Sequence, residues 1–147
     1  MIRTISRFDY DRIYELLRAY RDQSGIEQVS KLDNSAHIEL VLNHIRAGGG
    51  VGLVACRDQE VVGILLGIIS PMVWDPHHLT LNELVFYVDV KSRFGRLGYL
   101  LLKEYVRIGQ GMKRTGQIQA FTMTRRAGTT LNYSRFGFRP VDENWAQ

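Results

Sequence analysis

The sequence contains little cysteine: Cys56 is the single one among 147 residues. One thiol cannot form an internal disulfide framework, and it cannot supply a cysteine-rich zinc site. Because Cys56 lies in an apolar stretch and no local feature suggests activation of its thiol, we interpret it as a small buried hydrophobic residue. Disulfide-stabilised and cysteine-zinc proteins are therefore excluded.

Long hydrophobic runs are also lacking. The longest, residues 61–69, contains two glycines and is about half of the roughly 20 residues that a membrane-spanning helix needs. The chain does not open with a basic segment followed by an apolar one, which is the pattern of a signal peptide. We therefore expect a cytoplasmic protein without a membrane partner. With no internal repeat or linker, we expect one domain over residues 1–147.

The charge is moderately positive. Lys and Arg number 19 against 15 Asp and Glu, which gives a net charge of +4. Such a bias suits a polyanionic ligand, and both nucleic acid and a nucleotide cofactor satisfy it. The cations concentrate in residues 91–96 without a recognised nucleic-acid-binding motif, so we expect no nucleic-acid partner.

Hydrophobic periodicity predicts the elements of the first half of the chain. Asp9 is a candidate N-cap for a helix whose apolar face extends to Tyr20. Asn34-Ser35 is a candidate N-cap for a second helix, which three consecutive glycines, 48–50, would end. The expected strands are residues 1–5, 52–56 and 61–69, and the last two form a hairpin.

The second half begins with an expected loop over residues 70–80, which contains two prolines and Trp74. Beyond it, residues 81–90 and 117–124 have the composition of strands. Helices are expected at residues 99–110, which have a broad apolar face, and at residues 129–135.

A basic loop with glycines joins the strand at 81–90 to the following helix. Gly95 and Gly98 allow a close approach of the backbone, and Arg93 and Arg96 supply positive charge. The first turn of a helix also presents unpaired backbone N–H groups, which bind phosphate. The loop lacks the Gly-Lys-Ser/Thr ending of a nucleoside-triphosphate P-loop, and its context differs from that of a dinucleotide-binding fold.

Residues 88–101 resemble the acetyl-CoA-binding motif of the GNAT superfamily of N-acetyltransferases. In that motif a strand ending in Val is followed by Arg/Gln-x-x-Gly-x-Gly/Ala and a Leu-rich helix. About 40 residues later, residues 133–138 resemble the second hallmark of the family, a Tyr followed by Gly-Phe. The likeness covers nearly the whole chain. It implies an α/β fold of the α+β type, with a central mixed, mostly antiparallel sheet flanked by about four helices.

The resemblance implies acetyl-CoA as cosubstrate and no metal. The backbone of Val88 and Val90 would bind the pantetheine arm. The residues that would surround the pyrophosphate are Arg93, Phe94, Gly95, Arg96, Leu97, Gly98 and Tyr99. Two features depart from the family pattern. Arg96 replaces its first glycine, where a side chain either crowds or neutralises the pyrophosphate. The sequence also stops about ten residues after Phe138, which implies a short C-terminal part and an open acceptor side.

The implied reaction is direct attack of a primary amine on the thioester. A base must first remove a proton from the amine, and Glu83 on the strand at 81–90 is the candidate. The alternation of side chains along this strand does not settle which face Glu83 occupies. Tyr133 matches the family position that often donates a proton to the departing thiolate, although a core role is the simpler alternative.

Other polar residues have weaker claims to a function. His77 and His78 are adjacent in an expected loop and read as exposed, and His37 and His44 lack a third metal ligand. The specificity for the amine should come from the first two helices, the connection at 22–31 and the loop at 70–80. These segments do not name the acceptor.

Two alternatives stay open. The chain is either an acetyltransferase or a catalytically weak or inactive binding or assembly protein on the same fold, similar in brevity to some small GNAT-like proteins of phages. A short C-terminal part would also leave a sheet edge that a second copy could cover, so a homodimer is an open possibility.

Overall fold

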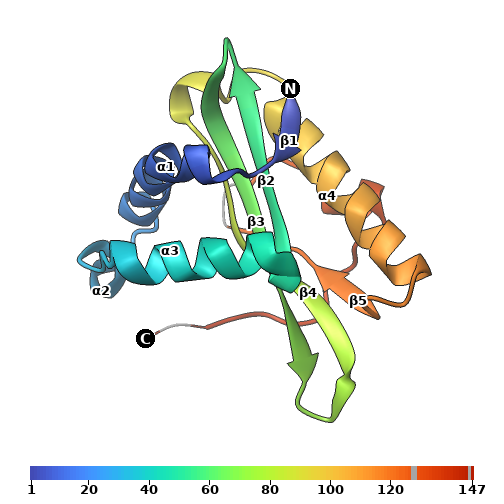
Figure 1. The fold of residues 1–147 in the computed structure, drawn as a ribbon. Helices are drawn as coiled ribbons and strands as arrows, with labels where there is room; N and C mark the ends of the chain where they lie inside the picture. Colours follow the sequence, from blue (N-terminus) through green and yellow to red (C-terminus); the bar gives the residue numbers. More distant parts are fainter. Residues whose placement is uncertain (127–128, 146) are drawn as a thin grey trace.

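The computed structural model describes residues 1–126, 129–145 and 147. Its centre is a five-stranded sheet in the order β1-β2-β3-β4-β5 (Figure 1). The first four strands pair antiparallel and β5 pairs parallel with β4, which confirms the expected mixed, mostly antiparallel sheet. The strands are β1 Ile2–Thr4, β2 Gly50–Arg57, β3 Glu60–Met72, β4 Asp75–Val88 and β5 Ala120–Thr122.

Helices cover both faces of the sheet. In Figure 1, α1 and α3 lie on one side of the sheet and α4 lies on the other. The α-helices are α1 Tyr10–Asp22, α2 Glu27–Ser30, α3 Ser35–His44 and α4 Leu97–Arg114. Single turns complete the chain: η1 Arg7–Asp9, η2 Ile45–Gly49, η3 Val90–Ser92 and η4 Tyr133–Phe136.

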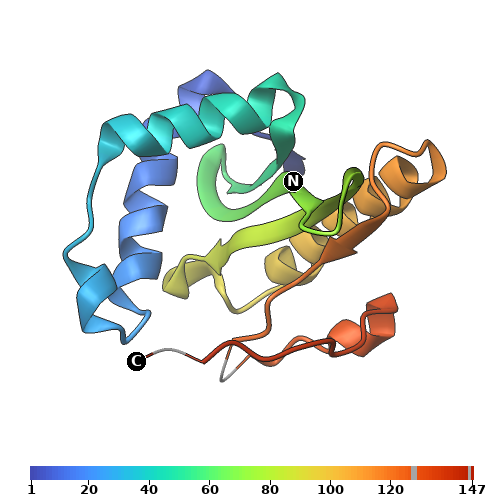
Figure 2. The ribbon, with the colours of Figure 1, turned by 90° about the horizontal axis from the view of Figure 1, so that it is seen from below.

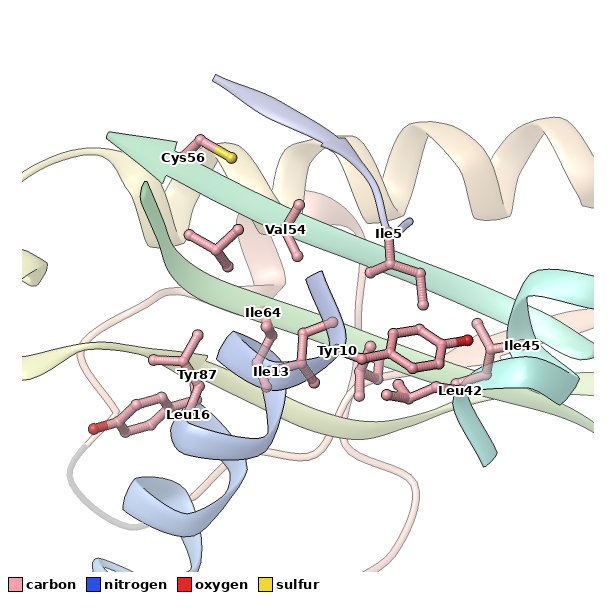
Figure 3. Packing of buried hydrophobic residues seen from close by; sticks show 12 residues of the cluster. Ile5, Tyr10, Ile13, Leu16, Leu42, Ile45, Val54, Cys56, Ile64 and Tyr87 are labelled. Carbon is pink, nitrogen blue, oxygen red and sulfur yellow. The ribbon is translucent and has the colours of Figure 1, made fainter. Parts of the chain in front are cut away.

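Each face of the sheet has its own hydrophobic core. Ile13 and Leu16 of α1 pack with Leu42 of α3 against the first face (Figure 3). On the second face, Leu101 and Tyr105 of α4 are fully buried against the strands. Burial of these apolar faces is the main contribution that holds the helices on the sheet.

The hairpin between β2 and β3 is confirmed, but the loop expected at residues 70–80 is wrong. Strands β3 and β4 instead continue their pairing through Pro71↔Leu79 to Met72↔Asp75. The prolines are tolerated because the pairing of β2 with β3 ends at Ile68, so this part of the hairpin has open edges. Trp74 at the tip is 88% exposed.

Several element ends differ from the prediction. The strand expected at residues 117–124 is shorter and consists of β5 alone, Ala120–Thr122. In place of the helix expected at 129–135, the described residues form only the η4 turn, which starts at Tyr133. Strand β4 ends at Val88, because Val90 already belongs to η3. Asn34 is confirmed as the N-cap of α3, since its side chain accepts from the His37 N–H.

Asp9 precedes α1 as predicted, but its side chain makes no capping bond to that helix. Its carboxylate accepts two hydrogen bonds from Arg3, both at 2.8 Å, and one from the Ser6 N–H at 2.7 Å. The chain entering α1 is thereby fixed to the end of β1. The bond from Arg3 is the main cause that lowers the pKa of Asp9 to about 2, against its ordinary 3.8.

This pair predicts a pH-dependent contribution to stability. The carboxylate is the favoured form in the folded chain, so its stabilisation is complete above about pH 4 and is lost as the pH falls toward 2. We expect Asp9→Asn to lower the free energy of unfolding by about 2 kcal/mol at pH 7. Urea unfolding at pH 7 and pH 2.5 measures it, and the difference should shrink at the lower pH.

The matched control is Asp11→Asn, which removes an exposed charge from the first turn of the same helix. It should change the stability by less than about 0.5 kcal/mol. An equal loss for both variants would mean that the Arg3–Asp9 pair contributes nothing specific.

Candidate functional site

A cleft opens where β4 and β5 separate. Their parallel pairing is limited to three residue pairs and ends at Asn82↔Thr122. Directly after this point β4 has a bulge, because Leu66 pairs with Val85 whereas Gly67 pairs with Glu83, which leaves Leu84 as the extra residue. The cleft has a volume of about 900 Å³. In Figure 2 the C-terminal segment passes below the sheet toward α2, and its Trp145 contributes to the lining.

The lining comes from four parts of the chain. Strand β4 and the loop before α4 form one wall, and the end of α1 with its following connection forms another. The segment after β5 and the C-terminal segment complete it. The lining residues include Tyr20, Gln23, Ser24, Ile26, Glu83, Phe86, Tyr87, Val88, Arg93, Gly95, Gly98, Tyr99, Thr124, Arg126, Leu131, Tyr133 and Trp145. The connection at 22–31 is thus in the cleft, whereas none of the described lining residues belongs to 70–80.

Glu83 lies at the point of separation. Its carboxylate accepts a hydrogen bond from the backbone N–H of Thr124 at 3.0 Å, so it bridges the gap between β4 and the chain after β5. Burial raises the pKa of Glu83, and the Thr124 bond and the charge of Arg126 oppose that rise. A carboxyl group with a raised pKa binds a proton more readily than an ordinary glutamate does.

Tyr133 reaches the same backbone unit from η4. Its hydroxyl donates to the Thr124 carbonyl oxygen at 3.3 Å. Burial raises the pKa of Tyr133 to about 12, and the nearby Glu83 charge adds to the rise. The phenol is therefore protonated at neutral pH. The structure brings the two predicted catalytic residues together through Thr124.

The edge of β4 beyond Asn82 is open toward the cleft. The Asp89 N–H donates to the Val62 carbonyl of β3 at 2.8 Å, so by strand alternation the backbone of Val88 points the other way. There the Val88 carbonyl accepts from Nε of Arg93 at 2.9 Å. Val90 lies outside the described lining and is 47% exposed.

The predicted phosphate loop is divided by the structure. Gly95, Gly98 and Tyr99 line the cleft, whereas Phe94, at 93% exposure, faces solvent. Leu97 is buried against the sheet. Arg96 is the N-cap residue of α4, and its guanidinium lies over the Tyr99 ring, 5.6 Å from the ring centroid.

Arg93 joins the loop to α1. Its Nη2 donates to the Gln23 side-chain oxygen at 2.8 Å, and the Gln23 nitrogen in turn donates to the Tyr87 hydroxyl at 3.1 Å. The guanidinium also stacks 5.2 Å from the centroid of the Tyr87 ring. Arg93 therefore positions the loop as well as contributing charge.

Two arginines beside the cleft were not assigned a role from the sequence. Arg57, at the end of β2, has its Nη2 3.2 Å from where a Cβ on Gly95 would lie. Arg126, after β5, lies 4.0 Å from the centroid of the Tyr20 ring. Neither arginine belongs to the predicted phosphate loop, so only their spatial position identifies them.

Metal ligands do not gather in the described parts of the chain: no group of three or more His, Cys, Asp or Glu side chains is close enough to hold an ion. Over the same residues, no helix is both long and apolar enough to cross a membrane.

One end of the cleft has features that can bind an anionic group. Gly95 and Gly98 present no side chain to it, and the first turn of α4 adds backbone N–H groups. The open backbone edge of β4 leads from that loop to Glu83. This arrangement places a glycine-containing helix N-terminus at one end of the cleft and the Glu83 and Tyr133 side chains along it.

Several solved structures with a similar fold are acetyltransferases by name. A predicted acetyltransferase from Clostridium acetobutylicum, solved with acetyl-CoA, matches with a TM-score of 0.75 and 14% identity over 100% of this chain and 94% of that one. An acetyltransferase from Trypanosoma brucei matches with a TM-score of 0.73 and 17% identity over 100% of this chain and 97% of that one. An aminoglycoside acetyltransferase from an uncultured soil sample, solved with sisomicin, matches with a TM-score of 0.67 and 15% identity over 100% of this chain and 92% of that one.

Neither a protein-family model nor a curated protein sequence matches the chain. The structural likeness nevertheless extends over the whole chain, including the elements around the cleft. The chain therefore has the fold of these acetyltransferases, a mixed α/β fold of the kind that the sequence resemblance implied.

Two glycines of α4 give a test of the cleft. A Cβ on Gly98 would lie 3.8 Å from Phe86 and Val88, an ordinary contact, whereas on Gly109 it would lie 2.8 Å from the Phe121 ring. We expect Gly98→Ala to raise the free energy of unfolding by about 0.5 kcal/mol through helix propensity. Gly109→Ala should lower it by about 1–3 kcal/mol through overpacking. Urea unfolding of both variants measures the contrast. A destabilised Gly98→Ala would contradict the open space beside this residue.

Proposed function

We propose that the chain, as one domain over residues 1–147, is an acetyl-CoA-dependent N-acetyltransferase that acts on a primary amine. The observation that supports this most directly is the backbone of Thr124, which hydrogen-bonds both Glu83 and Tyr133 beside the open edge of β4. The acetyl-CoA present in a structure with the same fold supports the cosubstrate.

The residues that would bind the cosubstrate lie along one wall of the cleft. The backbone of Val88 would bind the pantetheine arm along the edge of β4. The glycines at 95 and 98, with the first turn of α4, would receive the pyrophosphate. Arg57 and Arg93 are near enough to this loop to add positive charge. The bound acetyl-CoA would supply an acetyl group activated as a thioester.

Glu83 and Tyr133 would divide the proton transfers. The acceptor amine arrives as an ammonium ion, and Glu83 would take its proton so that the nitrogen lone pair can attack the acetyl carbon. The carbon–sulfur bond breaks with its electron pair on sulfur, and the Tyr133 hydroxyl would give that sulfur a proton. The attacking nitrogen loses its second proton as the amide forms, and transfer of this proton through solvent would restore the Tyr133 hydroxyl. A phenol with a pKa of about 12 is protonated at neutral pH and is therefore available as the donor.

Titration of the purified chain with acetyl-CoA by calorimetry tests the cosubstrate site. We expect micromolar binding that Arg93→Ala and Gly98→Trp each weaken by about tenfold or more, through loss of a charge-assisted contact and through filling of the cleft. The control Lys103→Ala removes an exposed charge from α4 outside the cleft lining and should leave the affinity unchanged. No binding at millimolar acetyl-CoA would overturn the proposal in favour of a non-catalytic binding or assembly protein.

The pH dependence of the reaction tests the base. Because burial raises the pKa of Glu83, kcat/KM should rise with pH through a pKa above the ordinary 4.5 of a glutamate. Glu83→Gln should remove this step and lower kcat about 100-fold or more, since general base catalysis contributes about that factor. Tyr133→Phe should lower kcat while the acid-side step remains. Release of CoA thiol measures both, and an unchanged profile in Glu83→Gln would exclude this residue as the base.

A further inference from the structure

The charged side chains of the cleft favour one kind of acceptor. Among its described lining residues, Glu83 is the single carboxylate and the two cations are Arg93 and Arg126. Arg93 is bound to Gln23 and to the Val88 carbonyl on the cosubstrate wall. Arg126 is on another wall, after β5, where its contact is the face of the Tyr20 ring.

Arg126 lies on the side of the cleft that α1 forms, because it contacts Tyr20 of that helix. Tyr20 lies near the end of that helix, and α1 covers the face of the sheet opposite to α4 (Figure 1). The Tyr20 ring also meets the Tyr87 ring edge-on, with centroids 6.0 Å apart. Since the cosubstrate would enter along the α4 loop, the α1 side is the one left for the acceptor.

Arg126 is suited to bind an anion there. Stacking on the Tyr20 ring uses the flat face of the guanidinium, whereas its N–H donors lie in the plane and stay able to bind a carboxylate or phosphate. Arg126 is also close enough to Glu83 for its charge to oppose the rise in the pKa of that carboxyl group. An anionic group on Arg126 and an amine at Glu83 can therefore belong to one small molecule.

We infer that the acceptor is an amine that carries an anionic group, a carboxylate or a phosphate, bound by Arg126 while the amine lies at Glu83. This inference rests on the proposed acetyltransferase function and specifies its substrate class. The same charges disfavour polycationic acceptors such as polyamines and aminoglycosides, which would bring several positive groups to one carboxylate and two guanidinium groups.

Matched pairs of amines test the inference. Glycine, β-alanine and γ-aminobutyrate are each compared with their carboxamide, and phosphoethanolamine with ethanolamine, with CoA thiol release as readout. After correction for the fraction of unprotonated amine, we expect kcat/KM to be about 10- to 100-fold higher for the anionic member, mainly through KM. The carboxylate and phosphate pairs identify which anion is preferred, and the chain-length series gives its distance from the amine.

Variants of Arg126 connect the preference to this side chain. Arg126→Ala should reduce the ratio between anionic and neutral amines to near one. Arg126→Lys should keep part of the ratio, and Arg126→Glu should shift the preference to diamines. The control Arg139→Ala removes the same charge from an exposed position outside the described lining and should keep the wild-type ratio.

The outcomes separate this inference from the proposed function. Acetyl-CoA binding is measured first, and its failure overturns both. If acetyl-CoA binds, the inference alone is overturned by any of three results. These are equal or higher rates with neutral or polycationic amines, a wild-type ratio in Arg126→Ala, and acetylation of none of the anionic amines.

Discussion

The early end of the pairing between β4 and β5 is the constraint on which the rest of the site depends. Two neighbouring parallel strands normally satisfy each other's backbone groups along their length, but here the pairing stops at Asn82↔Thr122. Beyond that point the backbone groups have other partners. At Thr124 those partners are the Glu83 carboxylate and the Tyr133 hydroxyl. The separation thus creates the cleft and also fixes the two side chains best suited to proton transfer within it.

The separation itself is enforced from the side of α4. Gly109 lets this helix approach β5 so closely that a Cβ would meet the Phe121 ring. The same ring is held by edge-on contacts with Tyr105 and Phe138, at centroid distances of 6.1 and 5.4 Å. The Tyr105 hydroxyl also donates to the Thr122 carbonyl at 3.2 Å. At the residue where the pairing with β4 ends, the backbone of β5 is therefore bound by a side chain of α4. Contacts with α4 therefore hold Phe121 and Thr122 of β5 in place, and the chain that follows separates from β4.

The fold was predictable where local patterns decide it. The helical periodicity before Tyr20, the Asn34 cap and the hairpin of β2 and β3 each follow from residues close in sequence, and the structure contains them. The face of Glu83 was not predictable, because the bulge at Leu84 interrupts the alternation on which such a prediction rests. The strand pairing within residues 70–80 was not predicted, because two prolines in a short segment are typical of a loop. Proline is compatible with a strand only at an unpaired sheet edge, and the sequence does not show that these residues lie at one.

The contacts of the site depend on residues far apart in sequence. Arg93 and Gln23 are 70 residues apart, and neither the phosphate-loop motif nor the helical pattern of α1 indicates that they meet. The same holds for Arg126 on Tyr20 and for Arg57 beside Gly95. A motif therefore indicated the glycine-containing loop before α4, whereas only the folded chain identifies the cations that surround the cleft.

Position 96 illustrates how the structure resolves a departure from a motif. A glycine is required where the backbone is left-handed or where a side chain would fill needed space. Arg96 has a φ of −91°, which any residue adopts, so the backbone does not need glycine here. Its side chain turns onto the Tyr99 ring and is not among the described residues that line the cleft. Tyr99 in turn packs on Phe136 of η4, at a centroid distance of 5.5 Å. Arg96 thus leaves the space beside the loop unfilled and adds a positive charge near it, which would attract the anionic cosubstrate that we propose.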